Sequence, residues 1–284
     1  MSRHLKFVSF PLLAATLLIG CSDSAPPPGL PPAITTFADS ENIYYLDTQK
    51  NLLKQIMNGG YHQARLSPDK TKVACVYEND IFATIISLNG NLEVEGKPKT
   101  VYNSQALSSG TGQGKSYYPT WSADGNKLFF INTNHLVAYD YTEKHTTILF
   151  DFPETQSAGL LPESGNMALS KDGSALYCML GQGTDKYAFW RIDASGSQES
   201  QLGVGDKSSV SGFHFPAELS DECIETLFGS REKPVWDPAV SNDGRYYFYV
   251  ESETGPLAKR LLKGYDRTQK TGFDVLNLGT TLFK

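Results

Sequence analysis

A tetrapeptide of the form Ser-x-Asp-Gly recurs four times along the chain and constrains its fold more than any other feature. The copies begin at Ser67, Ser122, Ser170 and Ser241, and Lys70 replaces the glycine in the first. Each copy is preceded by residues that alternate between apolar and polar, which is the period of a strand with one buried face. An apolar run follows each copy, over residues 72–77, 127–131, 175–180 and 245–250. Strand, turn and strand therefore recur as a hairpin unit.

The aspartate and the glycine of this motif suit a tight hairpin turn. An aspartate side chain accepts hydrogen bonds from its own downstream backbone, and glycine adopts a positive φ without strain. Lys70 predicts a first turn that is strained or of another type. Because every unit needs the same turn chemistry, we predict structural turn residues, rather than a calcium or acid-base site, at Asp69, Asp124, Gly125, Asp172, Gly173, Asp243 and Gly244.

Two further strand-like runs follow the hairpins, and four strands per unit is the composition of a propeller blade. The third runs are residues 81–88, 135–141, 187–192 and 260–265, and the fourth are residues 99–102, 146–150 and 273–278. The interval between Ser170 and Ser241 is the longest between neighbouring motifs. It leaves room for a degenerate blade or an insertion in residues 204–235.

The second copy is the most complete and extends upstream of its serine. It is Tyr118-Pro119-Thr120-Trp121-Ser122-Ala123-Asp124-Gly125, followed by the apolar residues 128–131. This segment resembles the WD40-like repeat of TolB-type β-propellers, whose usual form is Tyr-Pro-x-Trp-Ser-Pro-Asp-Gly. The resemblance covers residues 63–278 through four copies of differing quality. It departs from the usual proline at Ala123, Lys171 and Asn242, and the separate amino-terminal domain of TolB is missing. The resemblance implies the propeller superfamily and not TolB function.

The predicted fold class is all-β, a β-propeller of four-stranded blades over residues 33–284, with six blades favoured and five possible. About 42 residues per blade would give six. An aromatic content of 12% suits a sheet-rich protein. Residues 43–47 and 52–57 supply late strands of a further blade. Residues 280–284 would complete that blade, because closing the ring removes exposed sheet edges.

The first twenty residues have the pattern of a secretory signal peptide. Arg3 and Lys6 precede an apolar run from Phe7 to Ile19, which is shorter than the roughly 18–20 residues that span a bilayer. The run ends in Leu18-Ile19-Gly20-Cys21, which resembles the lipobox of bacterial lipoproteins. That resemblance implies cleavage before Cys21 and acylation of Cys21, including palmitate. An ordinary signal peptide with an incidental cysteine is the alternative.

Residues 21–32 are predicted to be a lipidated cysteine and a stiff tether. Five of the eleven residues from Ser22 to Pro32 are proline, a composition that favours extended polyproline II. We therefore predict a lipid anchor in the cell envelope. In a Gram-negative cell, Ser22 in place of the aspartate that retains many lipoproteins in the inner membrane favours the outer membrane, facing the periplasm.

The other cysteines are Cys75, Cys178 and Cys223, an odd number for an oxidising compartment. Cys75 and Cys178 each lie eight residues after a motif serine, so they occupy equivalent places in different blades. A disulfide needs Cα atoms within about 7 Å. We therefore predict that Cys75 and Cys178 are buried and unpaired, and leave the state of Cys223 open.

We find no catalytic signature in the sequence. Residues 109–116 nearly spell a phosphate-binding loop, but Ser109 stands where its first glycine is required and the segment leads into a strand instead of a helix. The histidines show no metal-binding spacing and are His4, His62, His135, His145 and His214. No Gly-x-Ser-x-Gly elbow is present. We predict no cofactor, no metal site and no enzymatic activity.

Two functions remain. The favoured one is a non-enzymatic scaffold whose propeller binds another envelope protein; the alternative is an enzyme that acts on a carbohydrate in the central channel, as TolB-like pectic-oligosaccharide lyases do with a histidine-rich metal site. A formal charge of −6 with scattered Lys and Arg argues against a nucleic-acid partner. The predicted binding face is the channel mouth where the innermost strands begin, at His62, Gln63, Tyr117, Tyr118, Asn166, Trp236 and Asp237.

Overall fold

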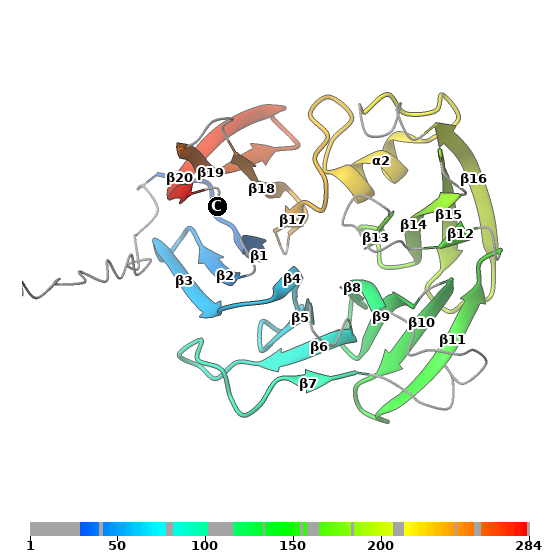
Figure 1. Ribbon diagram of the computed structural model, residues 1–284, viewed down its shortest axis with the longest axis horizontal. Helices are drawn as coiled ribbons and strands as arrows, with labels where there is room; N and C mark the ends of the chain where they lie inside the picture. The colour runs from blue at the N-terminus through cyan, green and yellow to red at the C-terminus, as the bar shows by residue number, and fades with distance from the viewer. Residues whose placement is uncertain are drawn as a thin grey trace, which may run out of the picture.

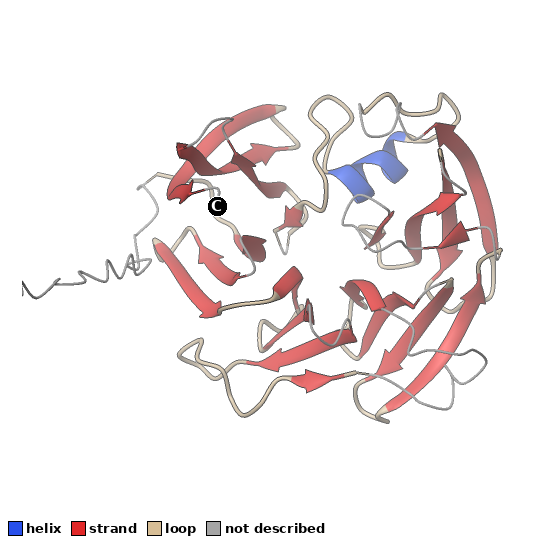
Figure 2. Cartoon of the chain, viewed as in Figure 1, coloured by secondary structure: helices blue, strands red, loops and turns tan. Residues whose placement is uncertain are grey.

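In the computed structural model, the protein is a ring of five β-sheets around a central axis (Figure 1). The structure describes residues 29–39, 42–77, 82–101, 116–132, 134–153, 156–157, 165–182, 185–206, 213–241, 243–252 and 257–282. In this part of the chain nearly all regular structure is strand, and one helix, α2 (Asp221–Phe228), lies between the fourth and fifth blades (Figure 2). The predicted all-β propeller is confirmed.

Each sheet is a blade of antiparallel strands that follow chain order from the axis outward. The first blade is β1 (Ile34–Asp39), β2 (Asn42–Asp47) and β3 (Leu52–Met57), and the second is β4 (Tyr61–Leu66), β5 (Lys72–Tyr77), β6 (Phe82–Ser87) and β7 (Lys99–Thr100). The third is β8 (Ser116–Trp121), β9 (Lys127–Asn132), β10 (His135–Asp140) and β11 (His145–Asp151). The fourth is β13 (Gly165–Leu169), β14 (Ala175–Gln182), β15 (Lys186–Asp193) and β16 (Glu199–Asp206), with β12 (Gln156–Ser157) paired to the end of β14. The fifth is β17 (Ala239–Val240), β18 (Tyr246–Ser252), β19 (Leu257–Asp266) and β20 (Thr271–Leu282).

The apolar runs that follow the motifs are the second strands of their blades. In β14, every residue from Ala175 to Leu180 is buried, and in β9 only Lys127 is exposed. Blades of a propeller stack face to face, so both faces of a middle strand are covered and the strand is apolar without alternation. The motif hairpins thus position the core of the ring.

The number of blades is five, the alternative left open by the sequence, and not the favoured six. Residues 204–235, on which a sixth blade depended, contain the end of β16 and then helix α2. The side chain of Ser220 caps this helix by accepting a 3.2 Å hydrogen bond from the backbone of Cys223, and Gly229 ends the helix with φ 84°. Apolar side chains at helical spacing, Cys223, Ile224, Leu227 and Phe228, form its buried face.

Helix α2 fills the space between the fourth and fifth blades. Its buried face packs on Tyr177 and Met179 of the fourth blade. Gly229 lies against the ring of Tyr247 in the fifth blade, where a Cβ would be 2.9 Å from ring carbons. The Tyr247 hydroxyl donates a 2.5 Å hydrogen bond to the Lys233 carbonyl. The helix and the loop after it therefore pack between the two blades, where in the rest of the ring one blade packs directly on the next.

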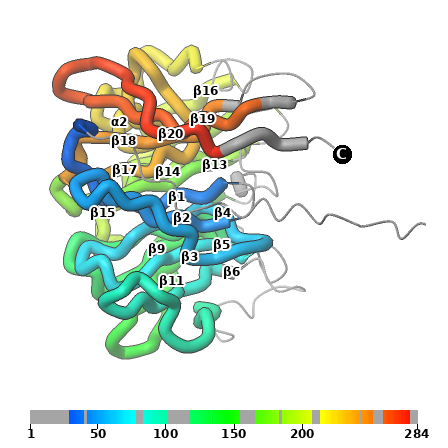
Figure 3. The backbone as a smooth tube through the Cα atoms, turned by 90° about the vertical axis from the view of Figure 1, so that its left-hand side faces the viewer, coloured from blue at the N-terminus to red at the C-terminus, as the bar shows by residue number. Residues whose placement is uncertain are grey.

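The ring closes differently from the prediction that residues 280–284 complete the first blade. Instead, β20 pairs with β19 up to Leu282, and the first blade has its own innermost strand, β1. The first and fifth blades share a core that includes Phe37, Leu46, Phe248 and Leu262. Seen from the side, the first blade lies between the fifth and the second (Figure 3). Side-chain packing closes this junction, reinforced by an ion pair between Arg260 and Asp39.

The three described cysteines, Cys75, Cys178 and Cys223, are free and buried. The prediction of buried, unpaired thiols at Cys75 and Cys178 is confirmed. Burial raises the pKa of all three thiols, that of Cys223 to about 12. They pack as small hydrophobic side chains.

The predicted signal peptide, Cys21 and most of the tether lie outside the described residues. Within the part of the chain that the structure describes, no helix is long and apolar enough to cross a membrane.

Candidate functional site

The four motif turns share one hydrogen-bond pattern at one end of the central channel. In each, the serine hydroxyl donates to the aspartate two residues later, at 2.5 to 2.6 Å. The same aspartate oxygen accepts a backbone N–H two residues further on, at 3.0 to 3.1 Å. Asp69, Asp124, Asp172 and Asp243 are therefore engaged inside their own turns.

These hydrogen bonds stabilise the charged form of the aspartates. Bonds from the Ser170 hydroxyl and from the backbone and hydroxyl of Ser174 lower the pKa of Asp172 to about 2. The pKa of Asp124 is lowered chiefly by the Ser122 hydroxyl. At neutral pH both carboxylates are ionised and hold their hairpins closed.

The residue with positive φ occupies the same position of the turn in all four copies. Gly125, Gly173 and Gly244 have φ of 71°, 75° and 71°, and Lys70 has φ 63°. The first turn is thus of the same type as the others and carries a lysine in a conformation that disfavours a Cβ, which is the strained outcome of the two expected.

Neighbouring turns pack on one another around the channel. Pro68 of the second blade lies over Gly125 of the third, and a Cβ on that glycine would be 3.4 Å from the proline ring. Ala123 of the third blade lies over Gly173 of the fourth, where the corresponding distance is 2.8 Å. In the second and third blades, the residue after the motif serine therefore covers the glycine of the next turn.

Four residues before the motif serine, the innermost strands contain a second recurring irregularity. Gln63, Tyr118 and Asp237 all have positive φ, at 56°, 56° and 47°. In the second and third blades the strand register shifts at this point. The fourth blade, with Asn166 at this position, keeps a regular ladder. These bulges turn side chains toward neighbouring blades.

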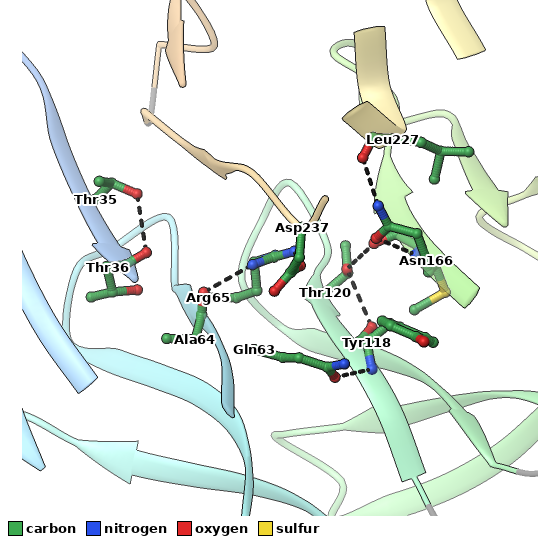
Figure 4. A network of polar contacts seen from close by, with 11 residues as sticks. Thr35, Thr36, Gln63, Ala64, Arg65, Tyr118, Thr120, Asn166, Leu227 and Asp237 are labelled. Atoms are coloured by element: carbon green, nitrogen blue, oxygen red, sulfur yellow. Dashed lines mark hydrogen bonds and ion pairs between the residues drawn. The ribbon is translucent and has the colours of Figure 1, made fainter. Parts of the chain in front are cut away.

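Side chains at these positions join adjacent innermost strands (Figure 4). The side-chain oxygen of Gln63 accepts a 2.7 Å hydrogen bond from the backbone N–H of Tyr118. Asn166 donates a 2.6 Å bond to the carbonyl of Leu227 in α2, and Thr120 donates a 3.3 Å bond to the carbonyl of Met167. These hydrogen bonds, which we call the girdle, link the innermost strands of the second, third and fourth blades to one another and to helix α2.

Most residues of the predicted binding face are packed into this girdle. Gln63, Tyr117, Tyr118 and Asn166 are buried, and His62, Trp236 and Asp237 are partly exposed. Tyr118 lies so close to Gly165 that a Cβ there would be 2.9 Å from its ring. Trp236 packs against Phe213 and Phe228, with ring centroids 5.6 and 5.4 Å away. The structure brings these residues to one end of the inner strands; whether a partner contacts them stays a prediction.

A cavity of about 490 Å³ occupies the axis at the other end, where the motif turns lie. Its walls include residues of all five innermost strands or their turns, such as Thr36, Ala64, Thr120, Ala168 and Val240. Exposed turn residues, among them Pro68, Ala123 and Lys171, form its rim, so the cavity opens to solvent at this end. Among the seven residues of the predicted binding face, Asn166 alone lines it.

An ion pair crosses the channel beyond the cavity. Arg65 of the second blade bonds Asp237, which precedes the innermost strand of the fifth (Figure 4). Arg65 lines the cavity and Asp237 belongs to the predicted mouth, so this pair links the cavity wall to that mouth. The pair could not be predicted from the sequence, because Arg65 and Asp237 come from different blades and meet only in the folded ring.

The described residues contain no group of three or more His, Cys, Asp or Glu side chains that could hold a metal ion. None of the described histidines, His62, His135, His145 and His214, lines the cavity. His135 hydrogen-bonds Asp151 on the outer part of the third blade, at 2.6 Å. His4 and the loop at residues 109–115 lie outside the described residues. The convergence of histidines that would favour the lyase alternative is therefore not seen in the described part of the chain.

No protein-family model matches the sequence, and no curated protein matches it either. Among solved structures, a chain of a nidogen/laminin complex aligns over 88% of this chain and 96% of its own, with 11% identity and a TM-score of 0.52. A putative TolB from Agrobacterium tumefaciens aligns over 90% of this chain and 81% of its own, with 14% identity and a TM-score of 0.44. An oligogalacturonate lyase in complex with manganese aligns over 83% and 70%, with 15% identity and a TM-score of 0.33. At 11% identity, the likeness to the nidogen/laminin chain concerns the fold alone.

Proposed function

We propose that this protein is a lipid-anchored protein of the cell envelope whose propeller binds another envelope protein without catalysing a reaction. The observation that carries the proposal is the cavity of about 490 Å³ on the axis, with its opening ringed by the motif turns. Recognition sites are typically concave, largely preformed and lined by a few fixed polar groups. We place the contact with the partner at this turn end of the channel.

The rigidity of the walls supports this placement. Hydrogen bonds link the innermost strands of the second, third and fourth blades beside the cavity, and at its rim two pairs of neighbouring turns pack on each other. A preformed site loses little conformational entropy when it binds. The hydrogen-bonded turn aspartates hold the rim in one shape and need no ligand to do so.

The envelope location rests on the amino-terminal sequence, Leu18-Ile19-Gly20-Cys21 after an apolar run. An acyl chain on Cys21 anchors the protein, and the proline-rich segment after it separates the propeller from the membrane surface. A partner in the same compartment would then meet a propeller that is held at a defined distance from the bilayer.

The proposal is tested by affinity capture from detergent-solubilised envelope after chemical cross-linking in cells. We compare the natural protein with Lys171→Glu, which reverses a charge at the cavity rim, and with Lys97→Glu, which makes the same change on an exposed loop of the second blade that does not line the cavity. Loss of one defined partner with Lys171→Glu and its retention with Lys97→Glu are expected. Equal capture by both variants would remove the turn end from consideration.

The same experiment includes the mouth predicted from sequence. His62→Ala changes a partly exposed residue of that face without removing an aromatic ring from the core. If His62→Ala abolishes capture and Lys171→Glu does not, the partner binds at the opposite end of the channel. If the natural protein captures no envelope protein, the binding function itself is wrong.

A further inference from the structure

The packing of one motif turn on the next stops between the fourth and fifth blades. Pro68 covers Gly125 and Ala123 covers Gly173, but no atom of the described residues lies within 4 Å of the position that a Cβ on Gly244 would occupy. The residue expected there is Lys171, which follows the motif serine of the fourth blade. Helix α2 lies between the two blades, and its residues Thr226 and Leu227 line the cavity there, so the fourth and fifth turns do not pack on each other.

Two positively charged side chains line the cavity beside the fourth and fifth turns. Lys171 comes from the fourth blade and is exposed, and Arg267 comes from the fifth and is half-buried. Arg267 donates hydrogen bonds to the carbonyls of Gly244, at 3.1 Å, and Glu225, at 2.9 Å. No ion pair joins Lys171 or Arg267 to an acidic side chain in the described part of the chain. The guanidinium of Arg267 also lies over the ring of Tyr247, 5.8 Å from its centroid.

Arg267 also has an unused donor. Its Nε is buried and has no hydrogen-bond acceptor among the described residues. Burial lowers the pKa of the guanidinium, because a charged group loses hydration when it leaves water. An unsatisfied buried donor on a charged group is costly unless an acceptor is supplied from outside the chain.

A second unused polar group lines the cavity from the first blade. The Thr36 hydroxyl is buried, at 1% exposure for the residue, and has no partner in the described structure. By contrast, the neighbouring Thr35 hydroxyl donates a 3.0 Å bond to the carbonyl of Val240. Thr36 is therefore a donor held in the wall with nothing to bind.

The other charges of the cavity are already engaged. Arg65 is paired with Asp237. Asp243 accepts bonds from the Ser241 hydroxyl, at 2.5 Å, and from the backbone of Arg245, at 3.1 Å. The donors that remain are the Lys171 ammonium, the Nε of Arg267 and the Thr36 hydroxyl, and two of them belong to positively charged side chains.

We propose that the part of the channel cavity beside the fourth and fifth turns is a carboxylate-binding site, with Arg267 and Lys171 as donors there and Thr36 as a donor from the first blade. The ligand is a free small carboxylic acid or a carboxylate on a partner's chain. In the second case the inference rests on the proposed function and names the group that the partner inserts. A guanidinium matches the planar, two-oxygen geometry of a carboxylate, which favours this class over a neutral ligand.

The site is tested with defined probes on the full chain carrying Cys21→Ala, which removes the predicted acylation site. The probes are succinate, its uncharged analogue succinamide, and acetyl-triglycine with a free carboxylate, each titrated at low ionic strength. The readouts are the dissociation constant by calorimetry and the Nε–H resonance of Arg267 in nitrogen-15 spectra, assigned by its loss in Arg267→Lys. Succinate or acetyl-triglycine should shift this resonance, and succinamide should not.

Three variants locate the binding. Lys171→Gln should raise the dissociation constant about two- to fivefold, the range for an exposed ion pair, and Lys97→Gln should leave it unchanged. Thr36→Val should weaken binding about tenfold or more, as expected for a hydrogen bond to a charged group. The same change should raise the denaturation midpoint of the ligand-free protein, because it removes an unsatisfied buried hydroxyl. If Thr36 had only a structural role, Thr36→Val would not weaken carboxylate binding.

Tighter binding of acetyl-triglycine than of succinate would assign the site to a partner's chain end, and the reverse would assign it to a free acid. Failure of both carboxylates to bind, or equal binding by the natural protein, Lys171→Gln and Thr36→Val, would overturn the inference. That failure is separate from failure of the proposed function. Partner capture without carboxylate binding leaves the scaffold role intact, and carboxylate binding without capture leaves the site intact.

Discussion

At the scale of single residues, the chain uses the same position for different purposes in different blades. The residue after the motif serine covers the next glycine in the second and third blades, whereas in the fourth blade it is Lys171, which does not cover Gly244. The left-handed position is glycine in three turns and Lys70 in the other. The turn residues were predictable from the sequence, because the hydrogen bonds of the motif are local. The consequence of Lys171 was not, because it depends on how far the fifth blade lies from the fourth.

Glycine-to-alanine substitutions separate backbone strain from packing. Gly244→Ala should cost about 1–2 kcal/mol, because alanine is strained at φ 71° but meets no neighbour. Gly173→Ala should cost roughly a further 1–3 kcal/mol, because its Cβ would lie 2.8 Å from that of Ala123. Urea denaturation measures both. Adding Ala123→Gly to Gly173→Ala should recover the extra cost, and an unchanged double mutant would mean that the two turns do not touch.

The turn aspartates predict the acid limb of stability. The folded pKa of Asp172, about 2, lies below the ordinary aspartate value of 3.8, so its contribution to stability is present above about pH 4 and is lost as the pH falls through 2. Asp172→Asn keeps a side chain that can close the turn but cannot titrate. The variant should be less stable at pH 7 and should lose less stability than the natural protein between pH 4 and pH 2. Parallel curves of unfolding free energy against pH would contradict the assignment.

At the scale of elements, the hairpins follow from the motif and the exceptions from its absence. Strands β5, β9, β14 and β18 lie where the apolar runs after each serine predicted them. Strand β1 was missed because its hairpin with β2 carries no Ser-x-Asp-Gly. Residues 204–235 were expected to hold a degenerate blade or an insertion, and helix α2 within them was not predicted, although Ser220, the acidic first turn and Gly229 are helix signals. Long spacing between repeats is therefore a weaker guide than local capping.

The plug formed by α2 should be important for stability. Phe228 is fully buried between the fourth and fifth blades, so Phe228→Ala should cost about 3–5 kcal/mol. Thr226→Ala, one turn face away and half-buried, should cost well under 1 kcal/mol. The comparison is made by denaturant unfolding. Similar small losses for both variants would mean that the helix is not a structural part of the ring.

At the scale of the whole molecule, the propeller architecture was predictable and its closure was not. Four motifs established the repeat, but the number of blades depended on whether residues 204–235 formed a sheet. The end of the channel that holds the cavity could not be predicted from the sequence either. Contacts such as the Arg65–Asp237 ion pair form only when the ring is complete. The candidate site is thus a property of the closed ring, whereas the turns that frame it are properties of short segments.

Membrane attachment is the prediction that concerns the whole chain. The natural protein should fractionate with membranes and carry the added mass of acyl chains on Cys21, because two or more acyl chains give stable anchoring. Cys21→Ala should move the propeller to the soluble fraction or leave it with an uncleaved signal. Cys178→Ala serves as the control, since Cys178 is buried in the propeller and should not affect fractionation. Unchanged mass and membrane attachment in Cys21→Ala would show that the lipobox resemblance is incidental.

The most direct measurement of the central claim is photo-cross-linking in intact cells from defined points on the propeller. A photoreactive phenylalanine analogue is introduced at Lys171 beside the cavity, at His62 near the opposite mouth, and at Lys97 on the outer part of the second blade. If the partner binds at the turn end of the channel, position 171 gives one envelope-protein adduct and positions 62 and 97 give none. An adduct from position 62 but not from position 171, or no adduct from any of the three, would contradict this placement.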